Sequence, residues 1–304
     1  MPVSLQAFIL IFVAGAALRT LGVLTKAHAE RLAGFVFCVT LPATIVLSLD
    51  GVTFAPTAWK LPLAAWMITC PIVGLAWILA RSWELPRPAQ GGFMLATGCI
   101  NSVYFAYPVI LATLGEAGLA RAVLFDLGQT ALTLTGLYAI AVWHGQTDEA
   151  PRSVLRRLLL TPPLWALAAI LVVKAVGVSL APWVRDVLTP LHLCTTPLAS
   201  LVLGLSMTFT ALRRTVWLAL AGVMLRMGGG LTIGWLVVSL LELTDMARLV
   251  VLLIAGMPSA VTAVIFASET RLDEDLVASI VALSICVGVA VLPGLPSLVT
   301  WLNG

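Results

Sequence analysis

Charged side chains are scarce in this chain, and their scarcity excludes an ordinary soluble protein. Only 10% of the 304 residues are charged, whereas 61% are hydrophobic, and the mean hydropathy is +1.07. A soluble protein keeps about a quarter of its residues charged because they cover a surface that faces water. A surface that faces lipid needs no charges, so the composition predicts an integral membrane protein.

Signs of metal, thiol or nucleic-acid chemistry are also missing. The chain has three histidines and five cysteines, and no Cys-x-x-Cys or His-rich spacing predicts a metal or cofactor. Its basic residues stand in short loops and form no patch for nucleic acid. An intramembrane enzyme would need a catalytic pair at facing depth, and a single mid-span aspartate offers none, so we expect no enzyme. We interpret the cysteines as small buried hydrophobic residues: Cys38, Cys70, Cys99, Cys194 and Cys286.

Apolar runs of about twenty residues, long enough to cross a hydrocarbon core, recur ten times. We therefore expect an all-α fold with ten transmembrane helices. The chain start has no basic leader and no small-residue cleavage site, so we expect the first run to be retained. The runs are 5–24, 32–49, 61–80, 91–114, 119–142, 158–180, 184–207, 216–241, 249–267 and 276–301.

The two halves of the chain resemble each other. A shift of 155 residues aligns every run of 1–149 with one of 150–304 and pairs Pro42 with Pro197, which predicts an internal repeat. Five helices per half is an odd number, so the second five-helix repeat must be inverted in the membrane. The linker His144 to Arg157 is the expected seam, and the excess of Lys and Arg on one side predicts that both termini lie outside.

Helix-breaking residues interrupt the fourth and ninth runs, which are partners in the repeat. Broken helices at equivalent positions of inverted halves typically mark a transporter's midplane site, where helix N-termini favour an anion. Alternatively, such residues only kink helices for packing. The fourth run contains Gly98, Asn101, Ser102, Tyr104 and Pro108, and the ninth contains Gly256, Pro258, Ser259 and Thr262.

Two charges fall well inside runs. Arg226 lies near the centre of the eighth run, and Asp126 lies in the fifth, one turn before Gln129. A charge at mid-membrane is costly and needs a partner or water. Arg226 could supply positive potential for an anion, and Asp126 could form a proton or cation site. The alternative is that Asp126 and Arg226 pair as fixed structure.

Three segments resemble the auxin efflux carrier family: LRTLGVLTKAHAERLAGFVFCVTLPATIVLSL, NSVYFAYPVILATLGEAGLARAVLFD and MPSAVTAVIFASETRLDEDLVASIV. The resemblance spans nearly the whole chain. It implies a fold similar to the bile acid:sodium symporters, with spans four and nine crossing at their breaks, and an elevator movement that carries organic anions. By position it places the crossover at Asn101, Pro108, Pro258 and Ala263. Ala263 is a departure, because some relatives have proline there, so Pro258 and Gly256 would form the second crossover.

Together these observations predict a secondary active transporter, or permease, that moves a small organic anion, a carboxylate, by alternating access in a bacterial inner membrane. An anion channel or facilitator, a sodium-coupled organic-acid symporter and a receptor remain as alternatives. We expect a proton or sodium ion as coupling partner, lipid as surroundings and, from the resemblance, a homodimer. The expected substrate-binding residues are Asn101, Ser102, Tyr104, Pro108, Gln129, Arg226, Pro258, Ser259 and Thr262.

Overall fold

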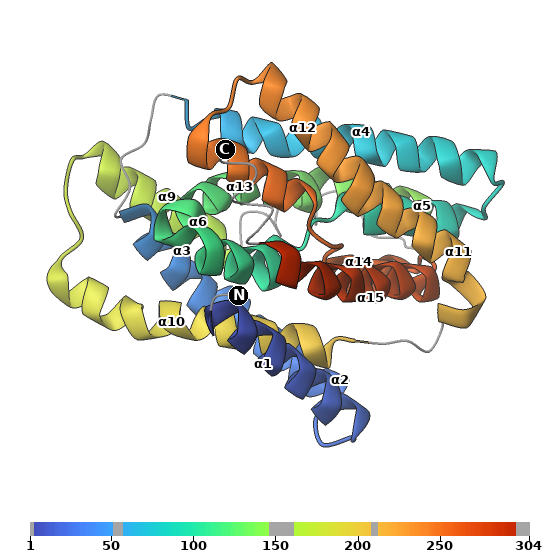
Figure 1. The fold of residues 1–304 in the computed structure, drawn as a ribbon, viewed down its shortest axis with the longest axis horizontal. Coiled ribbons are helices and arrows are strands. Elements are labelled where there is room, and N and C mark those ends of the chain that lie inside the picture. Colours follow the sequence, from blue (N-terminus) through green and yellow to red (C-terminus); the bar gives the residue numbers. More distant parts are fainter. Residues whose placement is uncertain (1–2, 51–56, 146–160, 208–211, 296–304) are drawn as a thin grey trace. The chain divides into compact units, whose positions relative to one another are not determined.

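The computed structural model describes residues 3–50, 57–145, 161–207 and 212–295, and these residues form helices without a strand. Figure 1 shows their arrangement. The predicted seam and both chain ends lie largely or wholly outside the described residues. The α-helices are α1 (Val3–Thr20), α2 (Lys26–Phe35), α3 (Leu41–Asp50), α4 (Lys60–Ser82), α5 (Arg87–Gly98), α6 (Tyr107–Leu132), α7 (Tyr138–His144), α9 (Pro162–Ala175), α10 (Pro182–Leu205), α11 (Leu212–Val223), α12 (Gly230–Leu240), α13 (Asp245–Ala255), α14 (Thr262–Thr270) and α15 (Glu274–Val291).

Several of these helices continue into one another through π-helical turns. Such turns join α2 to α3, precede and follow α6, and join α11 to α12. At each of these places the helical backbone continues from one segment into the next. A π-turn widens the helix by one residue and is frequent where a helix carries a functional group. The turns are Val36–Thr40, Ser102–Ala106, Thr133–Leu137 and Met224–Gly229, and a short 3-10 turn, Leu292–Gly294, follows α15.

Seven helices in the described part of the chain are long and apolar enough to cross a membrane. The fourth and ninth apolar runs are not counted there as continuous spans, because each is divided into shorter helices. The prediction of an all-helical membrane protein is therefore confirmed, whereas the count of ten spans stays a prediction. The seven are Val3–Thr20, Lys26–Asp50, Lys60–Ser82, Ser102–His144, Pro182–Leu205, Thr215–Leu240 and Glu274–Gly294.

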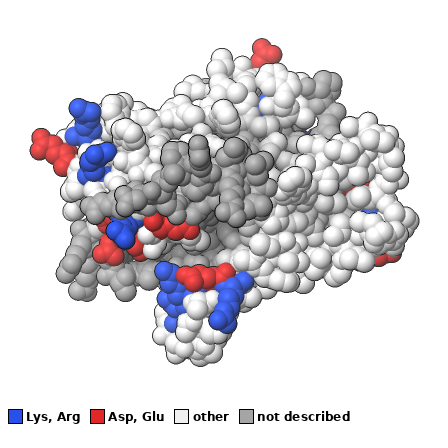
Figure 2. All heavy atoms as spheres, turned by 180° about the vertical axis from the view of Figure 1, so that it is seen from behind, with Lys and Arg blue, Asp and Glu red and all other residues white. Residues whose placement is uncertain are grey.

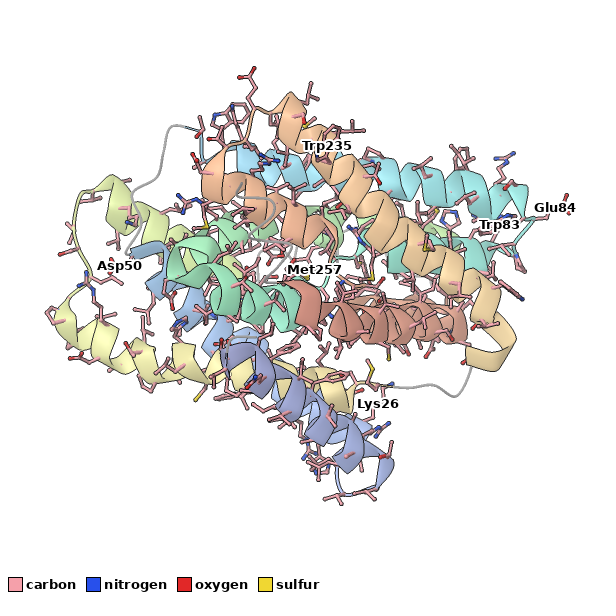
Figure 3. The ribbon with its side chains drawn as sticks, viewed as in Figure 1. Lys26, Asp50, Trp83, Glu84, Trp235 and Met257 are labelled. Atoms are coloured by element: carbon pink, nitrogen blue, oxygen red, sulfur yellow. The ribbon has the colours of Figure 1, made fainter. Side chains whose placement is uncertain are left out.

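The surface has the character expected of helices in lipid. The side chains of Leu10 and Trp217 are 69% and 81% exposed. Exposing such large apolar side chains is unfavourable in water but not in the hydrocarbon of a membrane. On the face in Figure 2 the charged side chains form small groups separated by broad uncharged areas. Charges also mark helix ends: Lys26 begins α2, Asp50 ends α3, and Glu84 follows α4 (Figure 3).

The described chain forms two compact units. The first comprises Met1–Ala58, Val103–Val123 and Leu159–Met207. In it α1 and α3 pack on α10, and α9 packs on α3. The second comprises Trp59–Ser102, Leu124–Leu158 and Thr208–Gly304.

In the second unit α5 is the central helix, packed on α4, α7 and α15, while α12 packs on α4 and α13. Each unit draws on both sequence halves, 1–149 and 150–304. The units are thus not the two predicted repeats, whose existence stays a prediction.

Glycines allow α1 and α10 to approach closely in the first unit. A Cβ at Gly204 would collide with the Phe12 carbonyl oxygen, and a Cβ at Gly15 would come within 2.8 Å of the Leu201 carbonyl oxygen. Without a strong hydrophobic force between helices in lipid, small residues at the interface let backbones pack by van der Waals contact. The pair Gly15 and Gly204 therefore fixes this crossing.

Replacing Gly204 by alanine should separate α1 from α10 and lower the free energy of unfolding by about 1 to 3 kcal/mol. The matched control is Gly34→Ala on α2, where a Cβ would meet open space and helix propensity favours alanine. Thermal unfolding of the purified variants measures both effects. Equal midpoints for the two variants would contradict a close crossing at Gly204.

Candidate functional site

Two helices of the second unit break and pair with each other at their breaks. The first, α5, ends at Gly98, and a helical backbone resumes at Ser102; the second, α13, ends at Ala255, and α14 begins at Thr262. Ile100 and Ser259 form an antiparallel bridge between the two interruptions. The Asn101 amide donates to the Pro258 carbonyl at 2.9 Å, and the Ala260 amide donates to the Cys99 carbonyl at 2.9 Å.

This pairing answers the main difficulty of a broken helix in a membrane. A break frees backbone groups, and hydrocarbon offers them no hydrogen-bond partner. Here each break supplies partners for the other. Both breaks fall within the two runs that the sequence singled out.

Arg226 connects the carbonyl ends of the two interrupted helices. It lies in the π-turn Met224–Gly229, and its side chain is fully buried. Its Nη1 donates to the Thr97 carbonyl of α5 at 3.3 Å, and its Nη2 donates to the Ala255 carbonyl of α13 at 2.8 Å. A cation at a helix C-terminus offsets the negative end of the helix dipole, and Arg226 does this for two helices at once.

A glycine makes room for this contact. A Cβ at Gly230, the first residue of α12, would collide with the Ala255 carbonyl oxygen and would lie 2.5 Å from Nη2 of Arg226. The close approach of α12 to the end of α13 therefore depends on the missing side chain. The run Gly228, Gly229 and Gly230, which begins two residues after Arg226, is the sequence signal that could have found it.

Four buried polar atoms around the breaks have no hydrogen-bond partner among the described residues: Asn101 Oδ1, Ser102 Oγ, Ser259 Oγ and Arg226 Nε. Asn101, Ser102 and Ser259 are 1%, 3% and 0% exposed. A buried polar atom left without a partner costs about 1 to 3 kcal/mol. Such atoms are rare in native structures and call for an explanation, and a ligand or water bound between the breaks would satisfy them.

Gln129 holds three elements of the second unit together. Its amide nitrogen donates to the Gly98 carbonyl, the last of α5, at 3.0 Å, and also to Thr133 Oγ1 at 3.3 Å. Its amide oxygen accepts from Thr69 Oγ1 of α4 at 2.7 Å. Both amide atoms of this predicted substrate-binding residue are thus engaged by the protein.

Most of the other predicted site residues of the second unit lie at the break between α13 and α14. Gly256 caps α13, and Pro258 supplies a carbonyl to the bridge. Thr262 is the first residue of α14, and the buried Ala263 follows it. Asp126 is half-buried on α6, where it accepts from Thr130 Oγ1 at 3.4 Å.

Two predicted site residues belong to the first unit. Tyr104 is half-buried, and its hydroxyl donates to the Ala33 carbonyl at 3.3 Å. Pro108 is buried in the first turn of α6, directly after the π-turn Ser102–Ala106. Proline lacks the N–H that would bond the preceding turn, which accounts for an irregular turn at this point.

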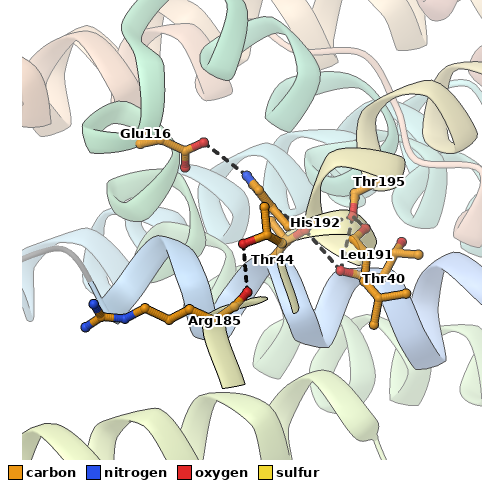
Figure 4. Close-up of polar contacts among 8 residues, drawn as sticks. Thr40, Thr44, Glu116, Arg185, Leu191, His192 and Thr195 are labelled. Atoms are coloured by element: carbon orange, nitrogen blue, oxygen red, sulfur yellow. Dashed lines mark hydrogen bonds and ion pairs between the residues drawn. The ribbon is translucent and has the colours of Figure 1, made fainter. Parts of the chain in front are cut away.

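A second polar cluster lies in the first unit, around His192 of α10 (Figure 4). The ring is 8% exposed, with Nε2 at 3.0 Å from Glu116 Oε1 and Nδ1 at 3.2 Å from Thr44 Oγ1. Thr44 Oγ1 is in turn 2.8 Å from Thr195 Oγ1, which also donates to the Thr40 carbonyl. The cluster ties α10 to α3 and α6.

Sequence reasoning missed several of these partners. Ser284 of α15 accepts from the Ser259 amide at 3.0 Å, and Thr69 anchors Gln129. Each is a polar residue in a mainly apolar helix, and this is the sequence feature that could have identified it as a site residue. Among the described residues, no group of three or more His, Cys, Asp or Glu is placed to hold a metal ion.

Comparison with known proteins identifies membrane transporters as relatives along nearly the whole chain. Residues 3–296 match a family model described as "Membrane transport protein", the model of the auxin efflux carrier family. An "Uncharacterized transporter" of Methanothermobacter thermautotrophicus is 30% identical over 288 residues, 92% of each chain. A transporter of the same description in Methanocaldococcus jannaschii is also 30% identical over 288 residues, again 92% of each.

The Arg226 bridge can be tested with a substitution that keeps the charge. In Arg226→Lys a single nitrogen replaces the guanidinium fork, so at least one of the two helix-end carbonyls loses its hydrogen bond. The cost of burying a positive charge remains. We expect the free energy of unfolding to fall by about 1 to 3 kcal/mol. Gly230→Ala should have an effect of the same sign, because the new Cβ displaces the guanidinium.

The control is Arg121→Lys, since the Arg121 side chain donates to the Ala117 carbonyl of its own helix at 2.8 Å. A surface change of this kind stays within about 0.5 kcal/mol. Thermal unfolding in detergent compares the three variants. If Arg226→Lys unfolds at the same temperature as Arg121→Lys, the bridge contributes nothing.

Proposed function

We propose that this chain, which belongs to the auxin efflux carrier family of membrane transport proteins, is a secondary transporter of a small organic carboxylate. The substrate would bind where the two broken helices pair. The observation that supports this site is the set of buried polar atoms there that lack partners among the described residues. A substrate bound between the breaks would give these atoms partners.

The donors at this position suit an anion. The hydroxyls of Ser102 and Ser259 can each donate, and a negative charge is favoured beside the N-terminus of α14 by the helix dipole. Thr262 is the first residue of that helix. Arg226 would act indirectly, because two of its nitrogens already bond carbonyls. Its charge still raises the local positive potential.

Transport would follow an alternating-access cycle of the elevator type. The second unit contains both breaks, Arg226 and Gln129, so it is the natural carrier of the substrate. The first unit, with its close crossing of α1 and α10, would serve as the scaffold. We place these units in a ten-helix fold of two inverted repeats in a bacterial inner membrane. Both termini would lie on the outer side of that membrane, and the assembly would be a homodimer.

Coupling to an ion is part of the same proposal. Asp126 is a half-buried carboxylate on the helix that also carries Gln129, and an intramembrane carboxylate commonly binds a proton or sodium ion. A sodium-coupled symporter is thus a variant of the proposed carrier. A channel or facilitator is the rival, and it would use the same fold without a cycle.

Counterflow in proteoliposomes distinguishes a carrier from a channel. With a saturating unlabelled carboxylate inside, uptake of the labelled acid should accelerate, because a carrier returns faster when it is loaded. A channel has no return step, so its uptake should not respond to the trans substrate. Absence of trans-stimulation for every transported acid would reject the carrier proposal.

Ser259→Ala tests the position of the site. Its hydroxyl has no partner among the described residues, so its removal should leave folding and membrane insertion intact. Loss of one hydrogen bond to a charged ligand should lower uptake at subsaturating substrate roughly tenfold. The matched control is Ser239→Ala, whose exposed hydroxyl bonds the Trp235 carbonyl of its own helix. Equal uptake by the two variants would place the substrate elsewhere.

A further inference from the structure

The side-chain amide of Asn101 is oriented by the protein backbone. Its Nδ2 donates to the Ser259 carbonyl at 3.3 Å, while its Oδ1 has no partner among the described residues. The opposite orientation would place two acceptors, Oδ1 and the carbonyl oxygen, against each other. The nitrogen therefore faces Ser259, and the oxygen is the atom left over.

The Ser259 backbone cannot easily move to change this assignment. Its residue is paired with Ile100 in the antiparallel bridge, and its amide donates to Ser284 Oγ at 3.0 Å. The Ser284 hydroxyl donates in turn to the Val281 carbonyl at 2.8 Å. The backbone that holds Nδ2 is thus fixed from both sides.

The unpaired atom of Asn101 is an acceptor, and a carboxylate is also only an acceptor. A simple ionised acid would satisfy the hydroxyls of Ser102 and Ser259 but would leave Oδ1 unpaired. A ligand that satisfies Asn101 Oδ1 together with the two hydroxyls needs a donor group beside its carboxylate.

We infer that the crossover selects a hydroxy acid, whose hydroxyl donates to Asn101 Oδ1 while its carboxylate accepts from Ser102 and Ser259. This inference rests on the proposed function. Asn101 would then determine specificity by its oxygen. The sequence alone predicts only that Asn101 binds the substrate.

A metal cation is the competing occupant for a set of oxygen atoms. The guanidinium of Arg226 opposes it, because its nitrogens bond the Thr97 and Ala255 carbonyls within a few residues of Asn101 and Ser259. A second positive charge there would be repelled in a poorly screened environment. The neutral hydroxyl of an acid brings a donor without adding charge.

The test compares acids that differ only at the hydroxyl: glycolate with acetate, lactate with propionate, and malate with succinate. Binding to the purified full chain is measured by thermal shift, and transport by competition in proteoliposomes, each with and without sodium. Each hydroxy acid should bind at least about tenfold more tightly than its partner. Methoxyacetate, in which an ether replaces the hydroxyl donor of glycolate, should bind no better than acetate.

Asn101→Leu should bring the ratio within each pair close to one, because it removes the acceptor. The methoxyacetate comparison needs no variant, so it decides the inference even if Asn101→Leu fails to fold. Equal binding within all pairs would overturn the hydroxyl preference and leave the carboxylate transporter intact. Stabilisation by sodium alone, lost in Asn101→Leu, would assign Oδ1 to a cation. Binding of none of the acids would reject the proposed function itself.

Discussion

This structure depends on one constraint: where water is absent, every backbone N–H and C=O group needs a hydrogen-bond partner within the protein. Two membrane helices that stop halfway violate it locally, and the chain restores it by pairing the interruptions and by spreading one guanidinium over both carbonyl ends. The glycine at 230 exists at this position because the charge and the neighbouring helix need its space. The interior of the second unit is therefore organised around backbone groups, with side chains as the means of satisfying them.

The two compact units solve different problems. In the first, close glycine contacts and a chain of hydroxyls and one imidazole join the helices. In the second, Gln129 and Arg226 connect backbone ends to side chains, and some polar atoms are left over. Among the described residues, four of the buried polar atoms without a partner lie in the second unit and one, Ser48 Oγ, lies in the first. The larger number of unpaired atoms in the second unit suits ligand binding. This contrast underlies the division of labour that we propose.

The sequence predicted the membrane class, the helical fold and the location of both breaks, because hydropathy and helix-breaking residues are local signals. It could not predict which atoms meet. Arg226 was expected near an anion, yet two of its nitrogens bond carbonyls, since only the folded chain brings residues 97, 226 and 255 together. Gln129 was expected to contact substrate, yet its amide is engaged by Thr69 and Gly98. Ser284 and Gly230 were missed because their importance lies in contacts with residues distant along the chain.

Arg226 has a mechanical consequence as well. To slide α5 past α13, the protein would have to break the two charge-assisted hydrogen bonds that Arg226 donates to these helices. In the cycle that we propose, the two interrupted helices and Arg226 would therefore move together as one rigid body. The backbone changes that such a cycle needs would then fall in other segments of the chain.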